Sequence, residues 1–205
     1  MLQTPPSRVE RRKEKTRKIL LGVALGLFYE QGIYWTKIED ITERADIGKG
    51  TFYQYFETKE ELLKTLLQLG LDVLLARTSE AIDGVKPDSK ILSRIIQAQL
   101  EFHIEHPEYL LFFHQIRGLL QFTTEPVNDL RKVYNVYLDQ LAEVIEPALN
   151  GRGGAGASAR ELAMAVSAFS LGLLTHHLLF DKAGTFKHRR DDIQAVLERS
   201  IYALV

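Results

Sequence analysis

Side chains that can contact nucleic acid are gathered in one segment of this chain, residues 36–61, which reads TKIEDITERADIGKGTFYQYFETKEE. Lysine can pair with phosphate or guanine, threonine with a phosphate or a thymine methyl, and glutamine with adenine. Thr36 stands at an expected helix start, where its hydroxyl and nearby amides can meet a further phosphate. The segment therefore predicts a surface for duplex DNA, with these candidate residues after its first glycine: Lys49, Thr51, Tyr53 and Gln54.

Helical spacing with one interruption indicates how this segment positions those side chains. Ile38, Ile41 and Ala45 recur on one helix face, and the triplet Asp-Ile-Gly at 46–48 breaks the pattern. The piece after the break carries polar and aromatic residues rather than an apolar stripe. A short helix, a tight turn and a second short helix with outward polar groups form a helix-turn-helix, whose second helix enters a DNA groove.

Three residue pairs have the capping-box spacing, Ser or Thr followed three positions later by Glu, that marks helix starts. The pairs are Thr36 with Glu39, Thr58 with Glu61, and Ser158 with Glu161. The first two flank the motif, and the third opens a strongly apolar helix. Tyr34 and Trp35 precede the first pair, and two interpretations stay open: a hydrophobic staple, or packing of Trp35 against a sugar-phosphate backbone.

The rest of the chain also reads as helix, without an alternating strand pattern or an internal repeat. An apolar stripe from Ile19 to Phe28 ends at Gly32, a residue suited to close a helix. Further helices are expected over about 58–82 and 89–103, from Pro107 and from Pro126, and over 158–180 and 190–204. We therefore predict an all-α fold: residues 1–57 as an N-terminal arm and three-helix helix-turn-helix domain, and 58–205 as a larger helical bundle.

The composition is that of a folded, water-soluble chain. Of its 205 residues, 45% are hydrophobic and 26% are charged, and none is cysteine, which excludes disulfides and thiolate catalysis. Residues such as Gly70 and Arg77 interrupt the apolar runs, so we expect no membrane-spanning helix and no membrane partner. The N-terminal stretch lacks the apolar core of a secretory signal, so we expect a cytoplasmic protein.

Positive charge is concentrated at the N-terminus although the net charge is only −1. Residues 1–20 hold seven Lys or Arg against two Glu. A basic arm beside a helix-turn-helix can add phosphate contacts or enter the adjacent minor groove. The alternative is a solvated, disordered tail; its place beside the motif favours the arm.

Histidine and glutamate residues around position 105 raise the question of metal binding or acid-base chemistry. His103 and His106 have a spacing that helical metal ligands use, but Pro107 breaks the helix at that point. Glu101, His103 and Glu105 match no signature of a nucleophile or of a paired acid and base. We therefore expect no metal site, no cofactor and no enzymatic activity.

The stretch GKGTFYQYFETKEELL, residues 48–63, resembles the signature that ends the DNA-binding domain of the TetR family of bacterial transcriptional regulators. Residues 24–32 (ALGLFYEQG) and 41–47 also fall where that family places them, and the resemblance covers about residues 17–63. Gly48 replaces the usual Ser or Thr cap, Asp46 a turn glycine and Thr42 an alanine. Glycine is an acceptable N-cap and Asp tolerates the left-handed conformation, so we expect the fold to be kept.

This resemblance implies a homodimeric regulator, more often a repressor, that reads a palindromic operator with two recognition helices. Tyr53 and Lys59 would then hold phosphates that flank the groove. The last two long helices would build a four-helix dimer interface, where small residues permit close approach. The candidates for this interface are Ala165, Ala168, Gly172, Val196, Leu197 and Ile201.

The resemblance also implies a small hydrophobic or amphipathic effector bound between helices of the C-terminal bundle, which is rich in aromatic residues. The candidate lining residues are Phe113, Tyr137, Phe169 and His176. The alternative is an all-α dimeric protein-interaction module without an effector response. Salt-dependent duplex binding separates the two hypotheses, since phosphate contacts impose a steep salt dependence.

Overall fold

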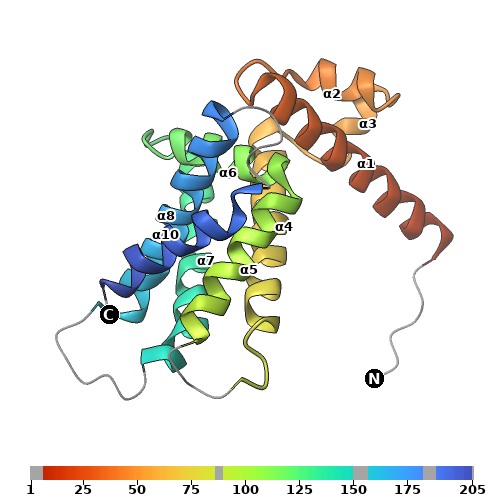
Figure 1. The fold of residues 1–205 in the computed structure, drawn as a ribbon. Coiled ribbons are helices and arrows are strands. Elements are labelled where there is room, and N and C mark those ends of the chain that lie inside the picture. Colours follow the sequence, from red (N-terminus) through yellow and green to blue (C-terminus); the bar gives the residue numbers. More distant parts are fainter. Residues whose placement is uncertain (1–6, 86–89, 150–156, 182–187, 205) are drawn as a thin grey trace. The chain divides into compact units, whose positions relative to one another are not determined.

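The computed structural model describes residues 7–85, 90–149, 157–181 and 188–204, and within these ranges every regular element is a helix (Figure 1). The all-α prediction is therefore confirmed for the part of the chain that the structure describes. Contacts divide the chain into two compact units, residues 1–66 and 67–205. Helix α4, Lys59–Glu80, begins in the first unit and continues into the second. The domain boundary expected after residue 57 remains a prediction.

The first unit contains α1 (Arg8–Gln31), α2 (Ile38–Arg44), α3 (Lys49–Phe52) and the first turns of α4. Its core forms where the apolar residues in the second half of α1, from Leu20 to Phe28, pack against the short helices. Each short helix brings few apolar side chains, so the core is small. Its fully buried members include Leu20, Ala24, Phe28, Ile41, Phe52 and Leu62.

Helix α1 begins earlier than the apolar stripe predicts. Ser7 and Glu10 form a capping box, in which the Glu10 amide donates to the Ser7 hydroxyl (3.2 Å) and the Ser7 amide to the Glu10 carboxylate (2.6 Å). The basic residues from Arg8 to Lys18 therefore lie on helical turns, and only residues 1–6 of the expected arm fall outside the described residues. Gly32, at φ 88°, closes α1 as predicted.

The second unit is built from the rest of α4 and from α5 (Ile91–Glu105), α6 (Pro107–Leu119), α7 (Glu125–Leu149), α8 (Ala159–Phe180) and α10 (Arg190–Tyr202). Helix α8 is central to it, because it packs against α5, α6, α7 and α10. Pro107 opens α6 and Ser158 caps α8 through Glu161, both as predicted.

Helix α8 requires a correction to the expectation about membrane spans. By length and composition alone, Ala159–Phe180 could cross a bilayer. Its buried residues instead face the four helices packed around it, as in the core helix of a helical bundle. Several large apolar side chains of α8 nevertheless remain exposed: Met164, Phe169, Leu179 and Phe180.

Candidate nucleic-acid interface

The turn between α2 and α3 has the backbone conformation that the sequence predicts. Asp46 adopts φ 52°, the left-handed conformation that Asp tolerates better than most residues with a side chain. The amide of Ile47 donates to the carbonyl of Thr42 (3.0 Å), which closes the turn. Gly48 then precedes α3 as its N-cap, without a side-chain bond. The two short helices are thus joined as in a helix-turn-helix.

The expected capping box of Thr36 and Glu39 is wrong. Helix α2 begins one residue later, and the amide of its N-cap, Lys37, donates to the carboxylate of Asp40 (2.8 Å). The hydroxyl of Thr36 instead donates to the carbonyl of Gly32 (2.8 Å), and its side chain is buried. Thr36 therefore joins the end of α1 to the start of α2.

Thr58 caps α4 as predicted, with one difference in the partner of Glu61. The Glu61 amide donates to the Thr58 hydroxyl (3.1 Å). The Glu61 carboxylate accepts from the amide of Glu57 (2.6 Å) rather than from that of Thr58. The start of α4, which follows α3, is therefore held by one hydrogen bond to Thr58 and by one from Glu57.

Helix α3 and the turn after it divide their side chains between core and solvent. Phe52 and Phe56 are buried, as the sequence predicts, whereas Tyr53 is 47% exposed with its ring edge-on to Phe52. The predicted DNA-contact residues therefore lie beside a fixed aromatic core, and they differ in exposure. Lys49, Tyr53 and Gln54 are exposed, and Thr51 is half-buried.

Lys49 already has a charged partner in the free protein. Its ammonium group pairs with the carboxylate of Glu39 on α2. This hydrogen bond raises the pKa of Lys49 and lowers that of Glu39. Both side chains are exposed, so a phosphate can replace Glu39 as the partner of the lysine at small cost.

Lys59 lies differently from the other predicted contact residues. Its ammonium group donates to the carbonyl of Ile33 and to that of Thr36 (2.6 Å), and it lies 6.0 Å from the centre of the Phe28 ring. Partial burial lowers the pKa of Lys59. The first residue of α4 thus holds the two ends of the short turn, residues 33–36, between α1 and α2.

Tyr34 and Trp35, the two residues inside that turn, point into solvent. Tyr34 is 83% exposed and Trp35 is 71% exposed. Their rings contact each other edge to face, with centroids 4.9 Å apart. Of the two interpretations of these residues, the hydrophobic staple is wrong, because a staple would bury them against α2.

In the second unit, the predicted effector residues fall into two groups. Phe113 and Tyr137 are buried in the bundle. The Tyr137 hydroxyl accepts a hydrogen bond from the Gln99 side chain (3.0 Å), and the Phe113 ring lies edge-on to His103, with centroids 6.0 Å apart. Gln99 and His103 are one turn apart on α5, so both aromatic residues border the same face of that helix.

Buried polar atoms without a hydrogen-bond partner lie in this same unit; the sequence drew attention to His103 only as a metal or acid-base candidate, and to Ser170 and Thr175 not at all. Within the described residues, His103 Nδ1, Ser170 Oγ and Thr175 Oγ1 are buried and make no hydrogen bond. Burial lowers the pKa of His103 to about 3, so the imidazole is neutral. In the sequence, these residues could have been recognised as polar residues that interrupt the apolar stretches of α5 and α8.

Phe169 and His176 form the second group and lie on an exposed face shared by α8 and α10. With Ala168, Gly172 and Val196 they line a shallow hollow of about 440 Å³. Four of the six predicted dimer residues border this hollow: Ala168, Gly172, Val196 and the buried Leu197. Ala165 is half-buried on α8, whereas Leu197 and Ile201 of α10 are buried inside the chain.

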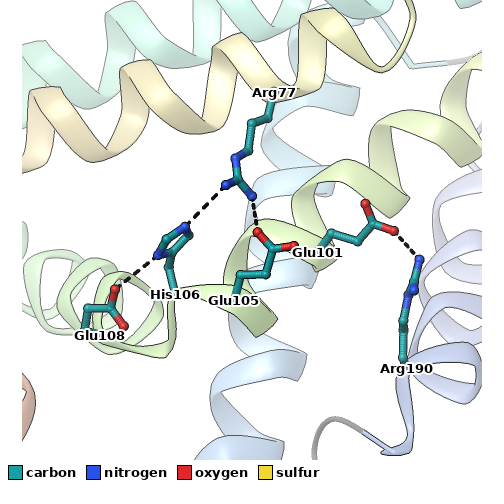
Figure 2. Close-up of polar contacts among 6 residues, drawn as sticks. All are labelled: Arg77, Glu101, Glu105, His106, Glu108 and Arg190. Atoms are coloured by element: carbon teal, nitrogen blue, oxygen red, sulfur yellow. Dashed lines mark hydrogen bonds and ion pairs between the residues drawn. The ribbon is translucent and has the colours of Figure 1, made fainter.

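A network of charged residues joins α4 to the junction of α5 and α6 (Figure 2). Arg77 pairs with Glu105, and its second nitrogen lies 3.5 Å from His106 Nε2. His106 Nδ1 in turn lies 3.2 Å from the Glu108 carboxylate. One turn before Glu105, Glu101 pairs with Arg190 of α10. Both glutamates considered above for acid-base chemistry are thus ion-paired, and the histidine between them is buried.

Comparison with known proteins agrees with the motif and with the fold. Residues 20–66 match the family model described as bacterial regulatory proteins, tetR family. The HTH-type transcriptional repressor KstR2 of Mycobacterium tuberculosis is 32% identical over 108 residues, which are 53% of this chain and 54% of that protein. The chain therefore spans about half the length of the curated relatives it matches.

Solved structures share the fold over most of the chain. A TetR-family regulator from Rhodococcus superposes with a TM-score of 0.74 at 18% identity, covering 93% of this chain and 98% of that one. The regulator FadR from Bacillus subtilis, solved with stearoyl-CoA, superposes with a TM-score of 0.73 at 17% identity, covering 88% and 96%.

Across its described residues the chain is thus an all-helical protein with an N-terminal helix-turn-helix. Residues 20–66, which contain this helix-turn-helix, match the tetR family model, in agreement with the resemblance of the motif.

Proposed function

We propose that this chain is a sequence-specific DNA-binding transcriptional regulator, a homodimeric repressor in the cytoplasm that a small-molecule effector releases from a palindromic operator. The observation that carries the proposal is the helix-turn-helix of residues 36–61, which matches the family model and presents polar side chains beside a buried aromatic core. The matched relatives are named as regulators, in line with a binding function rather than catalysis.

The proposed contacts to the operator begin on α3 and the turn after it. Tyr53 and Lys49 contact phosphates, Lys49 after leaving Glu39, and Gln54 and Thr51 reach base edges or the backbone. Thr36 is proposed to support this surface indirectly, because its hydroxyl donates to the carbonyl of Gly32 and its side chain is buried. A dimer would set two such surfaces about 34–36 Å apart, one helical turn of DNA.

Duplex binding by the purified chain tests this proposal. The protein is titrated against a pool of genomic fragments at two salt concentrations, with Tyr53→Ala as the comparison variant. We expect selective binding that weakens with salt, with a slope of log affinity on log salt of about −0.9 per phosphate contact. Tyr53→Ala is expected to lose about tenfold in affinity, because an exposed residue beside the groove is removed.

Two outcomes contradict the proposal. One is the absence of selective duplex binding at either salt concentration. The other is selective binding that Tyr53→Ala leaves unchanged and that does not respond to salt. Either result favours the protein-interaction module, whose partner would bind through surfaces other than α3.

The effector proposal rests on buried polar groups in the second unit. Gln99, Tyr137 and the unpartnered His103, Ser170 and Thr175 place hydrogen-bonding atoms among apolar side chains, the usual composition of a small-molecule site. One neighbour of the same fold was solved with stearoyl-CoA, so acyl-CoA thioesters are the first amphiphiles to add to the operator complex. An effector should lower the affinity of the chain for the operator. If no amphiphile changes that affinity, the effector proposal is contradicted.

Coupling between effector and operator is proposed to run along α4, which belongs to both units. In the second unit this helix touches α6 at Gly70 and is tied to the start of α6 through Arg77 and His106 (Figure 2). A ligand that favours another position of α6 would shift α4 as well, and thereby the population able to bind DNA.

A further inference from the structure

The turn between α1 and α2, residues 33–36, carries a feature that the recognition helix does not explain. Tyr34 and Trp35 expose 83% and 71% of their surface side by side. Single exposed apolar residues are ordinary, but adjacent large aromatic residues in solvent mark an interaction surface. Tyrosine and tryptophan combine a flat apolar face with a hydrogen-bond donor, which suits a surface that is partly apolar and partly polar.

The same turn is held in place by an unusual partner. Lys59, partly buried, gives its ammonium protons to the carbonyls of Ile33 and Thr36, on either side of the aromatic pair. Thr36 adds a bond to Gly32. Burying a lysine costs solvation, and here the compensation is two bonds to main-chain carbonyls that would otherwise need water. The aromatic pair is therefore presented by a turn that is fixed before any partner arrives.

We infer that Tyr34 and Trp35 bind the sugar-phosphate backbone beside the groove that α3 reads, and that Lys59 is a positioning residue for them. The occupant is DNA because the turn leads directly into α2, the first helix of the motif, which in such proteins crosses the backbone. The exposed Lys37 next in the chain adds positive charge there. Deoxyribose offers an apolar face to the rings, and a phosphate accepts from the indole N–H or the phenol O–H.

This inference rests on the proposed DNA function, and it differs from the expectation that Lys59 itself holds a phosphate. Two of the three N–H donors of the Lys59 ammonium group are given to carbonyls, so one remains for a phosphate and its direction is set by the turn. Its substitution would then weaken binding by releasing the turn rather than by removing a charge contact.

Trp35 is the only tryptophan of the chain, so its fluorescence reports on this turn alone. We expect a selected duplex to protect Trp35 from acrylamide quenching in the full-length wild-type protein. We expect Trp35→Ala and Tyr34→Ala each to lower affinity about tenfold, by a similar factor for every duplex sequence, because a backbone contact carries no base information. The matched control is Phe122→Ala, an aromatic residue of the second unit that is 51% exposed, and it should leave affinity unchanged.

Lys59→Met separates positioning from direct phosphate binding. We expect about tenfold weaker binding with an unchanged salt slope, together with greater mobility of Trp35, seen as lower fluorescence anisotropy in the free protein. A slope reduced by about 0.9, with Trp35 anisotropy unchanged, would make Lys59 a phosphate ligand and overturn its positioning role.

The failure of this inference can be distinguished from failure of the proposed function. If the wild type binds a duplex selectively and Tyr53→Ala loses it, the DNA function stands. Suppose the DNA function stands, but acrylamide quenches Trp35 equally with and without the duplex and Trp35→Ala binds with wild-type affinity. The aromatic pair then does not contact DNA. The quenching measurement on the wild type needs no variant, so it decides the question even where a substitution impairs folding.

Discussion

His103 is a neutral imidazole held inside the second unit, with its Nδ1 atom buried and without a hydrogen-bond partner. Burial lowers its pKa to about 3, and the nearby His106 adds to this effect. In an unfolded chain the pKa of histidine is about 6.5. Between these two pH values the unfolded chain binds a proton at this histidine and the folded chain does not. The contribution of His103 to folding stability is therefore fully present above pH 6.5 and is lost as the pH falls toward 3.

The expected loss is about 2 kcal/mol of unfolding free energy between pH 6.5 and pH 5, since each pH unit contributes about 1.4 kcal/mol for one such group. Urea unfolding at the two pH values measures it. His103→Gln should remove most of this difference, whereas His114→Gln, at an exposed histidine of α6, should keep it. Equal pH dependence in wild type and His103→Gln would mean that the imidazole has access to solvent.

At the scale of the element, α4 approaches α6 closely at Gly70. A Cβ atom at this position would lie 2.4 Å from Cε1 of Tyr109 and 2.8 Å from Cζ of Phe113. Both rings belong to a cluster with Phe102, so they have little freedom to move aside. The glycine is therefore required by packing and not by its backbone freedom.

Gly70→Ala should destabilise the second unit by about 1–3 kcal/mol, the usual cost of overpacking. Gly118→Ala is the matched control, because a Cβ atom at this position of α6 would meet nothing within 4 Å. That substitution should stabilise the helix by about 0.5–1 kcal/mol, as alanine has the higher helix propensity. Thermal unfolding of both variants is the measurement; similar effects in the two would show that α4 and α6 are farther apart.

At the scale of the whole molecule, the exposed apolar face of α8 and α10 is the surface proposed for the homodimer. Val196 and Phe169 expose 43% and 42% of their surface around the hollow at Gly172. Apolar side chains gathered on two neighbouring helices are a surface that a second copy of the chain can bury.

Val196→Glu should convert the dimer to a monomer, because a carboxylate would be placed without a partner in an apolar interface. Sedimentation velocity over a range of concentrations measures this. Val136→Glu on α7, at a residue that is 50% exposed outside that hollow, should leave the dimer intact. A Val196→Glu protein that sediments as the wild type does would move the interface to another face.

Local sequence was enough to predict the helices, the helix-turn-helix and the conformation of its turn. Helical periodicity, prolines at helix starts and the capping pair Ser158–Glu161 act over a few residues, so a single sequence contains them. The left-handed conformation of Asp46 (φ 52°) could also be predicted locally, because tolerance of that conformation is a property of the Asp residue itself.

The partners of individual side chains were decided by tertiary structure. The two carbonyl partners of Lys59 could not be predicted from local sequence, because the turn that carries them is up to 26 residues away, while its predicted phosphate contact stays a prediction. Phe113 and Phe169 were placed in one effector group, yet one is buried and the other exposed. Aromatic side chains look alike in sequence; which of them meet is decided by which helix faces pack together, and that depends on contacts distant along the chain.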